Sequence, residues 1–319
     1  MHMESTQATG SHRLIDVHHH FEPTARNAGG TRWSIEMALG EMDRNGVATA
    51  IGYGGPIFAD AAPNGRTAAR AINEWSTNHC LQHPGRFGLF ASIPMDDVDG
   101  SMAEIAYAFD VLHADGIGIA PKYGDAWLGD AKFRPIFEEL NRRSAVVYVH
   151  PARASSSGAL ATLNDEHGLI CAPWIEYPTD TARTILSLWA ARMTRELPNV
   201  KFLFCHGGGV MPILLGRFAG FAAWREMGPE RLASIFPDGV YAEFAKLYFE
   251  CAQAYAPEAF AMLRSLVPVS HVLFGTDFSY FPISHSVALF NDLVLAAEER
   301  RLISGENAGA LLPRWSAHA

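Results

Sequence analysis

The 319-residue sequence predicts an α/β protein built as a single (β/α)8 barrel of the TIM type, and three observations support this. Short runs of β-branched or aromatic residues recur along the chain, separated by longer segments with apolar residues at helical spacing. Strict alternation of strand and helix implies a parallel sheet, and eight such units in about 300 residues indicate a closed barrel. No glycine-rich dinucleotide motif follows the first strand, which disfavours an open, doubly wound sheet.

Eight strands and the helices between them are expected along the chain. The strands are predicted at residues 13–18, 48–53, 87–93, 116–120, 145–150, 200–206, 246–251 and 271–276. Helices are predicted at residues 34–45, 68–83, 101–114, 134–143 and 181–197. A disordered tail at 1–12 is expected to precede one catalytic domain at 13–319. The longest connections, 151–180 and 220–245, are expected to form lids or subunit contacts.

The composition limits the classes of partner. The net charge is −9, with 34 acidic against 25 basic residues and no basic run, so nucleic acid and anionic membrane surfaces are poor candidates. Neither a membrane-spanning segment nor a signal peptide is visible. The four cysteines lack paired spacing and indicate buried free thiols in a reducing cytoplasm. They are Cys80, Cys171, Cys205 and Cys251.

A histidine triplet ends the first predicted strand. Because side chains alternate along a strand, His18 and His20 share one face about 7 Å apart, while His19 points away. Two such imidazoles can bind one divalent metal ion. A purification-tag remnant is the alternative explanation, but a tag needs no buried strand such as residues 14–17. Asp16 is expected either to orient a ligand histidine or to bond main chain or water.

Histidine or aspartate also ends three further predicted strands, which are the positions where barrel enzymes place their catalytic groups. His150 ends the fifth strand, His206 the sixth and Asp277 the eighth. Three imidazoles and one carboxylate suit Zn²⁺, so His18, His20, His150 and Asp277 are predicted to hold one divalent metal ion. His206 is then left as the general acid/base. For His150 or His206 alone, a hydrogen-bonded interior histidine explains the sequence about equally well.

Short motifs in a fixed order cover nearly the whole chain. They are residues 15–20 (IDVHHH), 42–47 (MDRNGV), 83–87 (HPGRF), 149–151 (VHP), 176–181 (EYPTDT), 206–209 (HGGG) with Pro212 and Arg217, 274–277 (FGTD) and 307–308 (NA). With these motifs the chain resembles the metal-dependent amidohydrolase superfamily, and within it the aminocarboxymuconate-semialdehyde decarboxylase-like branch. In that branch it is most similar to 6-methylsalicylate decarboxylase-like sequences.

The resemblance implies a barrel of the metal-dependent hydrolase type. It assigns the metal ligands and the acid/base histidine to the residues predicted above. Mn²⁺ is the alternative to the Zn²⁺ that the ligand set favours. It also implies a homodimer or higher homo-oligomer, in which Arg217 reaches the substrate carboxylate of the neighbouring subunit. The semialdehyde decarboxylases carry a second carboxylate-binding arginine after the first strand. This chain has no clean match for it, since Arg26 and Arg32 both lie near that position. This departure favours an aromatic monoacid as substrate.

The predicted activity is non-oxidative decarboxylation of a small aromatic or unsaturated carboxylic acid, either hydroxybenzoate-like (as 6-methylsalicylate is) or aminocarboxymuconate-semialdehyde-like. A metal ion would hold the substrate carboxylate, and His206 or Asp277 would move a proton to the carbon that bears it. Addition of metal-activated water before C–C cleavage is the second route. Aromatic residues near strand ends are candidates to contact a planar ring: Tyr53, Tyr123, Trp174, Tyr177, Phe278 and Tyr280.

Two other functions remain open from the sequence. The first is hydrolysis of a lactone, amide or C–C bond, for which Lys122 would be carboxylated to bridge two metal ions. Lys122 follows Ala120 and Pro121, outside the fourth strand proper, which favours a single metal ion. The second is a barrel that binds a metal ion or ligand without turnover. No strand-end ligand is missing, which disfavours that function.

Overall fold

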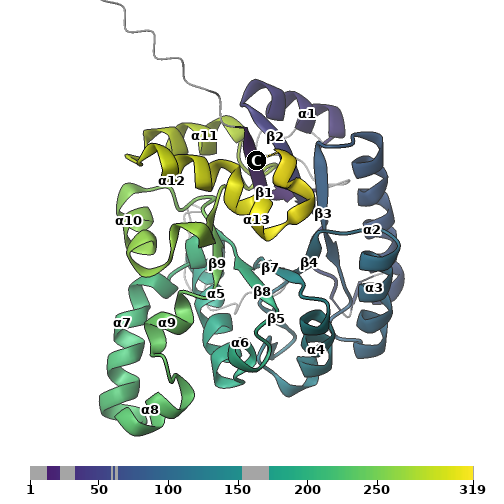
Figure 1. The fold of residues 1–319 in the computed structure, drawn as a ribbon. Coiled ribbons are helices and arrows are strands. Elements are labelled where there is room, and N and C mark those ends of the chain that lie inside the picture. Colours follow the sequence, from purple (N-terminus) through teal and green to yellow (C-terminus); the bar gives the residue numbers. More distant parts are fainter. Residues whose placement is uncertain (1–12, 22–32, 59, 62–63, 153–171, 319) are drawn as a thin grey trace, which may run out of the picture.

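Eight parallel strands follow one another around a barrel in chain order (Figure 1). Main-chain hydrogen bonds join the last part of the barrel to the first, from Val17 N to Phe274 O (3.1 Å) and from Asp277 N to His18 O (2.8 Å). The strands of the barrel are β1 Leu14–His20, β2 Val47–Tyr53, β3 Phe87–Ser92, β4 Gly116–Ile119, β7 Val146–Val149, β8 Lys201–Phe204, β9 Tyr248–Glu250 and β10 Val272–Leu273. All eight predicted strands are present, and the TIM-barrel prediction is confirmed.

This computed structural model describes residues 13–21, 33–58, 60–61, 64–152 and 172–318. The predicted tail at 1–12, Arg26, Arg32 and Cys171 lie outside the described residues, as does most of the predicted connection at 151–180. None of the helices in the described part combines the length and apolarity needed to cross a membrane.

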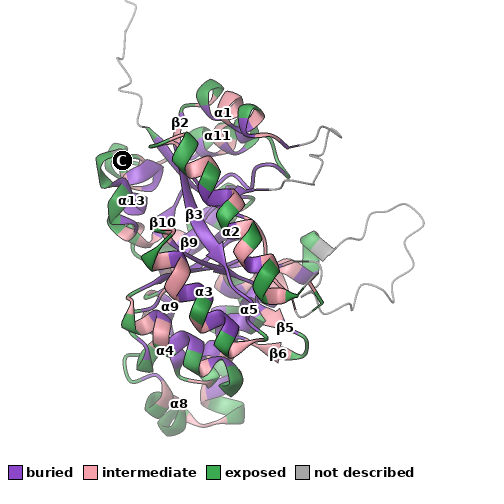
Figure 2. Ribbon diagram, turned by 90° about the vertical axis from the view of Figure 1, so that its right-hand side faces the viewer, coloured by how far each residue is buried: buried purple, intermediate pink, exposed green. Residues whose placement is uncertain are grey.

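Helices surround the barrel and expose their outer faces, while the strands are buried (Figure 2). They are α1 Ile35–Arg44, α2 Gly65–Gln82, α3 Val98–Asp110, α4 Arg134–Arg142, α5 Ala172–Ala190, α6 Met193–Glu196, α7 Met211–Phe221, α8 Pro229–Ile235, α9 Val240–Phe244, α10 Pro257–Leu266, α11 Ile283–Asp292, α12 Ala297–Arg301 and α13 Asn307–Leu311. Side-chain caps begin several of them, as Ser34 does for α1, where its hydroxyl accepts a hydrogen bond from Met37 N.

The segments predicted as long connections contain regular structure. Helix α5 begins at Ala172 instead of residue 181, and Pro178 lies inside it. Between residues 220 and 245 the chain forms a π-helical stretch at Ala222–Glu226, followed by α8 and α9. A short antiparallel hairpin that the sequence did not predict, β5 Lys122–Tyr123 with β6 Ala126–Trp127, follows β4.

Two apolar cores hold the site at one end of the barrel. The larger core lies between the strands and the surrounding helices. The smaller core fills the barrel interior, where Val17, Phe90 and Tyr148 pack with side chains of the neighbouring strands. Leu312 and Trp315, which follow α13, belong to this interior cluster, so the C-terminal segment packs against the barrel interior. The carboxyl ends of the strands then remain as the face on which polar side chains gather.

Candidate active site

A change of side-chain parity along β1 directs two histidines into the site. Val17 packs in the barrel interior, so regular alternation would place His19 on the inward face. The pairing of β1 with β2 is irregular between Asp16 and His19, and a bulge of this kind moves the following side chains to the opposite face. His18 and His20 therefore point toward each other in the site, and His19 lies among aromatic rings of the outer core.

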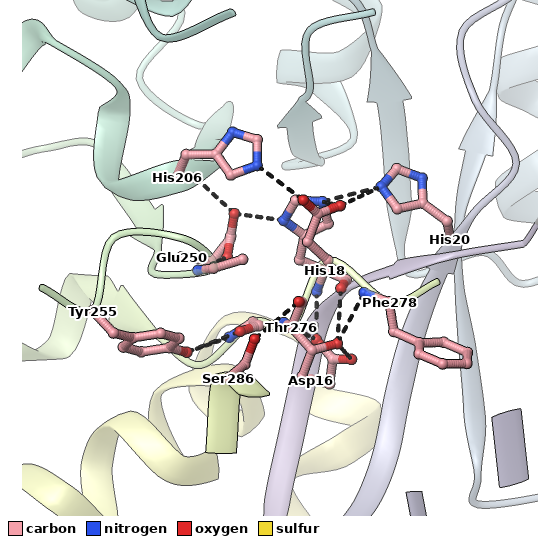
Figure 3. Close-up of polar contacts among 12 residues, drawn as sticks. Asp16, His18, His20, His206, Glu250, Tyr255, Thr276, Phe278 and Ser286 are labelled. Carbon is pink, nitrogen blue, oxygen red and sulfur yellow. Dashed lines mark hydrogen bonds and ion pairs between the residues drawn. The ribbon is translucent and has the colours of Figure 1, made fainter. Parts of the chain in front are cut away.

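Three of the predicted ligands form a close triangle of donor atoms. His18 Nε2 lies 3.2 Å from His20 Nε2, and Asp277 Oδ1 lies 3.2 Å from the former and 3.1 Å from the latter. His150 completes the group, and one donor atom from each of the four residues lies within 4.8 Å of the others. All four side chains are buried. The structure thus brings the four predicted ligands together (Figure 3 labels His18 and His20).

The group fits a divalent metal ion. Ligands about 2.0–2.1 Å from a tetrahedral zinc ion lie roughly 3.3 Å from one another, close to the spacing in the triangle. Buried His150 Nε2 has no hydrogen-bond partner within the described structure. A buried nitrogen without a partner is destabilising unless an ion or a water molecule binds it. Imidazole and carboxylate donors together suit Zn²⁺, and also accept Mn²⁺.

Local backbone geometry places the other strand-end residues. His150 continues the inward-facing positions Val146 and Tyr148 of β7 and comes directly after that strand. His206 and Asp277 adopt left-handed backbone conformations, with φ of 53° and 60°. Non-glycine residues adopt this region rarely, and they are found there where surrounding contacts hold them, as at active sites.

The environment sets the protonation of the cluster when no metal is bound. Burial opposes protonation of His18, but the carboxylates of Glu250 and Asp277 outweigh it and raise the pKa of His18 to about 10. Burial, reinforced by the neighbouring histidines, lowers the pKa of His150 well below its ordinary value. Burial opposes ionisation of Asp277, yet its charge and hydrogen-bond interactions with His18, His20 and His206 hold the pKa of this carboxyl well below its usual range. His150 and Asp277 are thus already in the forms that bind a metal ion.

The general acid/base candidate lies beside the same carboxylate. His206 Nε2 is 3.5 Å from Asp277 Oδ2, and its ring centroid is 5.1 Å from that of His18 and 5.4 Å from that of His150. The His206 side chain is about 15% exposed, whereas the side chain of His18 is 1% exposed. His206 is therefore the histidine of the group that retains access to solvent next to the candidate metal site.

Sequence reasoning missed Glu250, the last residue of β9. Its carboxylate is fully buried, and Oε1 lies 2.7 Å from His18 Nδ1 (Figure 3). Asp16, considered for this task, instead accepts hydrogen bonds from main-chain N of His18 and from both N and Oγ1 of Thr276. A signal for Glu250 was present, since an acidic residue interrupts the apolar run of the predicted strand at 246–251.

Two basic residues singled out from the sequence lie apart from the metal-ligand group. Arg217 is exposed on α7, with its guanidinium 4.5 Å from the ring centroid of Phe221. Lys122 lies in the hairpin after β4, where its ammonium group is 5.3 Å from the ring centroid of Trp127. All three groups of described residues with metal-binding geometry contain His18 or His150, so they belong to one cluster.

One of the aromatic candidates lines the site. The ring centroid of Tyr280 is 4.9 Å from that of His20, at nearly perpendicular planes, and the residue is 51% exposed. Tyr53 and Tyr123 are fully buried, and Phe278 packs against His19. Tyr280 is therefore the candidate best placed to meet a ligand at the mouth of the site.

The protein is a TIM barrel that gathers three histidines and an aspartate at the carboxyl ends of its strands. It therefore belongs to the class of barrel proteins with a candidate metal site at that end. The chain belongs to the amidohydrolase family, whose sequence pattern it matches over residues 15–314. This confirms the family predicted from the motifs.

Relatives with known activities are similar over most of the chain. A decarboxylase of Aspergillus niger, yanB, is 33% identical, covering 94% of this chain and 88% of that protein. The 6-methylsalicylic acid decarboxylase of Penicillium expansum is 30% identical, covering 94% of this chain and 96% of that protein. The chain is therefore a carboxy-lyase of the amidohydrolase superfamily, and the predicted decarboxylase class is confirmed over the hydrolase alternative.

Solved structures share the fold at lower sequence identity. A 2,6-dihydroxybenzoate decarboxylase in complex with 2,6-dihydroxybenzoate superposes with a TM-score of 0.83 at 20% identity, covering 94% of this chain and 99% of that one. A dihydroxybenzoic acid decarboxylase from Polaromonas sp. JS666, with bound manganese and the inhibitor 2-nitroresorcinol, gives a TM-score of 0.82 at 19% identity, covering 94% and 96%.

Proposed function

We propose that this protein is a metal-dependent, non-oxidative decarboxylase of a small aromatic carboxylic acid of the hydroxybenzoate type, such as 6-methylsalicylate. One observation carries the proposal: the His18, His20, His150 and Asp277 donor group lies directly beside His206 at the mouth of the barrel. The names of the relatives support the reaction class, and the absence of a clean match for a second carboxylate-binding arginine favours a monoacid.

His18, His20, His150 and Asp277 would hold the metal ion, for which this ligand set favours Zn²⁺. Manganese is bound in the structure of the Polaromonas decarboxylase, so the activity test uses Mn²⁺ alongside Zn²⁺. A divalent ion bound here supplies Lewis acidity and a template for the substrate carboxylate and any adjacent hydroxyl.

The residues of the chain then have to deliver one proton to the substrate. Loss of CO2 from an aromatic carboxylate breaks the C–C bond and leaves an electron pair on the ring carbon, so that carbon must gain a proton. His206 Nε2 and Asp277 Oδ2 lie 3.5 Å apart and face the same space, so either can deliver the proton and the other can replace it. The reaction balances as arene carboxylate plus a proton giving arene plus CO2.

Arg217 is proposed to bind the substrate carboxylate of a neighbouring subunit in a homodimer. Support comes from the surface around it, because large apolar side chains are exposed on the same helix and the stretch that follows: Ile213, Leu214, Phe221 and Trp224. Such a patch marks an interaction surface. The planar guanidinium of Arg217 offers two parallel donors that match a carboxylate. A cytoplasmic location is also proposed, because the described cysteines are free thiols.

The test is release of CO2 from a panel of acids. Protein loaded with Zn²⁺ or Mn²⁺ is incubated with 6-methylsalicylate, dihydroxybenzoates and muconate-type acids, and CO2 is measured together with the decarboxylated product. At least one hydroxybenzoate-type acid is expected to be turned over. Absence of CO2 across the panel, together with turnover of lactones or esters, would overturn the proposal.

A further inference from the structure

A fully buried carboxylate lies under the candidate metal site. Glu250 ends β9 and is 0% exposed. An ionised carboxylate removed from water is strongly destabilising unless hydrogen bonds replace its hydration. The structure provides three such bonds, from the ring of His18, from main-chain N of His206 and from main-chain N of Ala252. Each of these donors is therefore fixed relative to the others through one side chain.

The contact with His18 selects which ring nitrogen faces the metal-ligand group. Glu250 Oε1 is 2.7 Å from His18 Nδ1, and an ionised carboxylate only accepts hydrogen bonds, so Nδ1 carries the proton. When His18 is neutral, its lone pair is then on Nε2, which points to His20 and Asp277. A carboxylate on the distal nitrogen also makes an imidazole a stronger ligand.

The same oxygen holds the backbone of the proton-transfer histidine. His206 N donates to Glu250 Oε1 at 2.8 Å, at the point where the chain leaves β8 and enters the left-handed conformation of His206. One oxygen atom therefore links the side chain of a candidate ligand and the main chain of the candidate acid/base. The rings of His18 and His206, 5.1 Å apart between centroids, thus belong to two residues that share one acceptor atom.

The second oxygen prevents the carboxylate from turning. Glu250 Oε2 accepts from Ala252 N at 2.6 Å, so both oxygens have assigned donors. Gly275 packs directly against this carboxylate, and a Cβ there would overlap it. The glycine of the FGTD motif is thus explained by the space that Glu250 occupies.

We propose that Glu250 is a positioning residue that fixes the His18 tautomer for metal binding and holds His206 beside the Asp277 carboxylate. The second half of this inference rests on the proposed function, whereas the first concerns metal affinity alone. Glu250 contacts Nδ1 of His18 and main-chain N of His206, not the candidate ligand atom Nε2, and acts through these two histidines.

The experiment compares Glu250→Gln and Glu250→Asp with Glu243→Gln as a matched control. Glu243 is also a buried carboxylate with two polar partners, Thr194 and Lys246, but lies on α9. Zinc affinity is measured without substrate, by competition with a chromogenic chelator. Glu250→Gln is expected to bind Zn²⁺ about 10–100-fold more weakly than wild type, and Glu250→Asp to recover part of the loss, because a carboxylate remains. Glu243→Gln is expected to bind like wild type.

Two further readouts complete the test. In metal-saturated Glu250→Gln, kcat is expected to fall at least about tenfold with little change in KM, as for loss of a transition-state contact. In zinc-loaded wild type, nitrogen NMR is expected to show His18 protonated at Nδ1, with the signal assigned by its loss in His18→Gln; this readout needs no folded Glu250 variant. Wild-type zinc affinity in both Glu250 variants, equal weakening in Glu243→Gln, or a His18 proton on Nε2 would each overturn the inference. Failure of the acid panel would leave the zinc and NMR results untouched.

Discussion

His206 Nε2 lies 3.5 Å from Oδ2 of Asp277, while Oδ1 of the same carboxylate is 3.1 Å from His20 Nε2. The two oxygens of Asp277 thus face different neighbours, one in the candidate metal-ligand group and one at the proton-transfer histidine. A proton passing between His206 and Asp277 would change the charge next to the metal in the same step.

Replacing His206 with alanine is expected to separate metal binding from catalysis. The His206 side chain lies outside the triangle of donor atoms, so His206→Ala should retain a full complement of metal by elemental analysis. Loss of an acid/base group lowers kcat by about 10²–10⁴-fold, and CO2 release should fall by that factor. His83→Asn, beyond the end of α2, is the control and should keep wild-type activity. Loss of metal together with activity would mean that His206 is a ligand.

Metal binding is expected to release a proton at neutral pH. With no metal bound, the raised pKa of His18, about 10, keeps this imidazole protonated at pH 7, and Nε2 must lose its proton to bind the ion. As the pH is raised toward that pKa, the apparent metal affinity should therefore increase about tenfold per pH unit. Above the pKa it should level off. Titration calorimetry in two buffers of different ionisation enthalpy measures the number of protons released. A value of zero at pH 7 would show that His18 binds no metal or is neutral beforehand.

Much of the site could be predicted because its signals are local in sequence. His18, His20, His150, His206 and Asp277 each follow a buried apolar run, and in a parallel barrel all strand ends of one polarity meet on one face. Their convergence therefore needed no knowledge of long-range contacts.

The rest of the site depends on contacts that the sequence does not express. Glu250 matters because β9 lies beside β8 and near β1, so that one carboxylate reaches both His18 and His206. Regular alternation would put Asp16 on the face of His18 and His20. The bulge in β1 leaves its carboxylate beside His19 instead, because alternation is predictable only where the pairing is regular. The predicted start of α5, residue 181, is later than the observed start at Ala172, because a proline such as Pro178 usually indicates a helix break. Tertiary packing retains the helix around it, where the carbonyl of Pro178 accepts a hydrogen bond from Val210 N.

The proposal for Arg217 predicts complementation between two inactive variants. Arg217→Ala should bind substrate carboxylate poorly in the partner's site, and His206→Ala should lack proton transfer in its own. If Arg217 acts across an interface, a mixed dimer contains one site with both residues intact. Equal mixing after reversible dissociation should then restore about a quarter of wild-type activity. Mixtures as inactive as the separate variants, with mixed dimers verified by mass spectrometry, would place Arg217 outside the site.

Tyr280 is expected to contribute to substrate affinity through its ring. Its ring makes an edge-to-face contact with His20 and is half exposed, which places it where an aromatic acid in the site would pack. An aromatic pair contributes about 0.5–1.5 kcal/mol, so Tyr280→Ala should raise KM by roughly 2–12-fold. Tyr280→Phe retains the ring and should leave KM nearly unchanged, which separates the ring from the hydroxyl. Steady-state kinetics on the best acid of the panel measures both, and an equal effect of the two variants would assign the contribution to the hydroxyl.

Gly209 is expected to be required for the position of His206. It has a φ of +62°, and a Cβ there would overlap the carbonyl of Pro178 on α5. Its main-chain N also donates to His206 O at 3.0 Å, so strain at Gly209 is transmitted to the proton-transfer residue. Gly209→Ala should lower the free energy of unfolding by about 1–3 kcal/mol and reduce kcat, with metal content retained.

Gly40→Ala is the matched control. Gly40 lies inside α1, where a Cβ meets the flexible end of Arg44, and the substitution should raise the free energy of unfolding by about 0.5–1 kcal/mol. Urea unfolding measures both, and a Gly209→Ala protein as stable and active as wild type would show that the left-handed turn after β8 does not constrain the site.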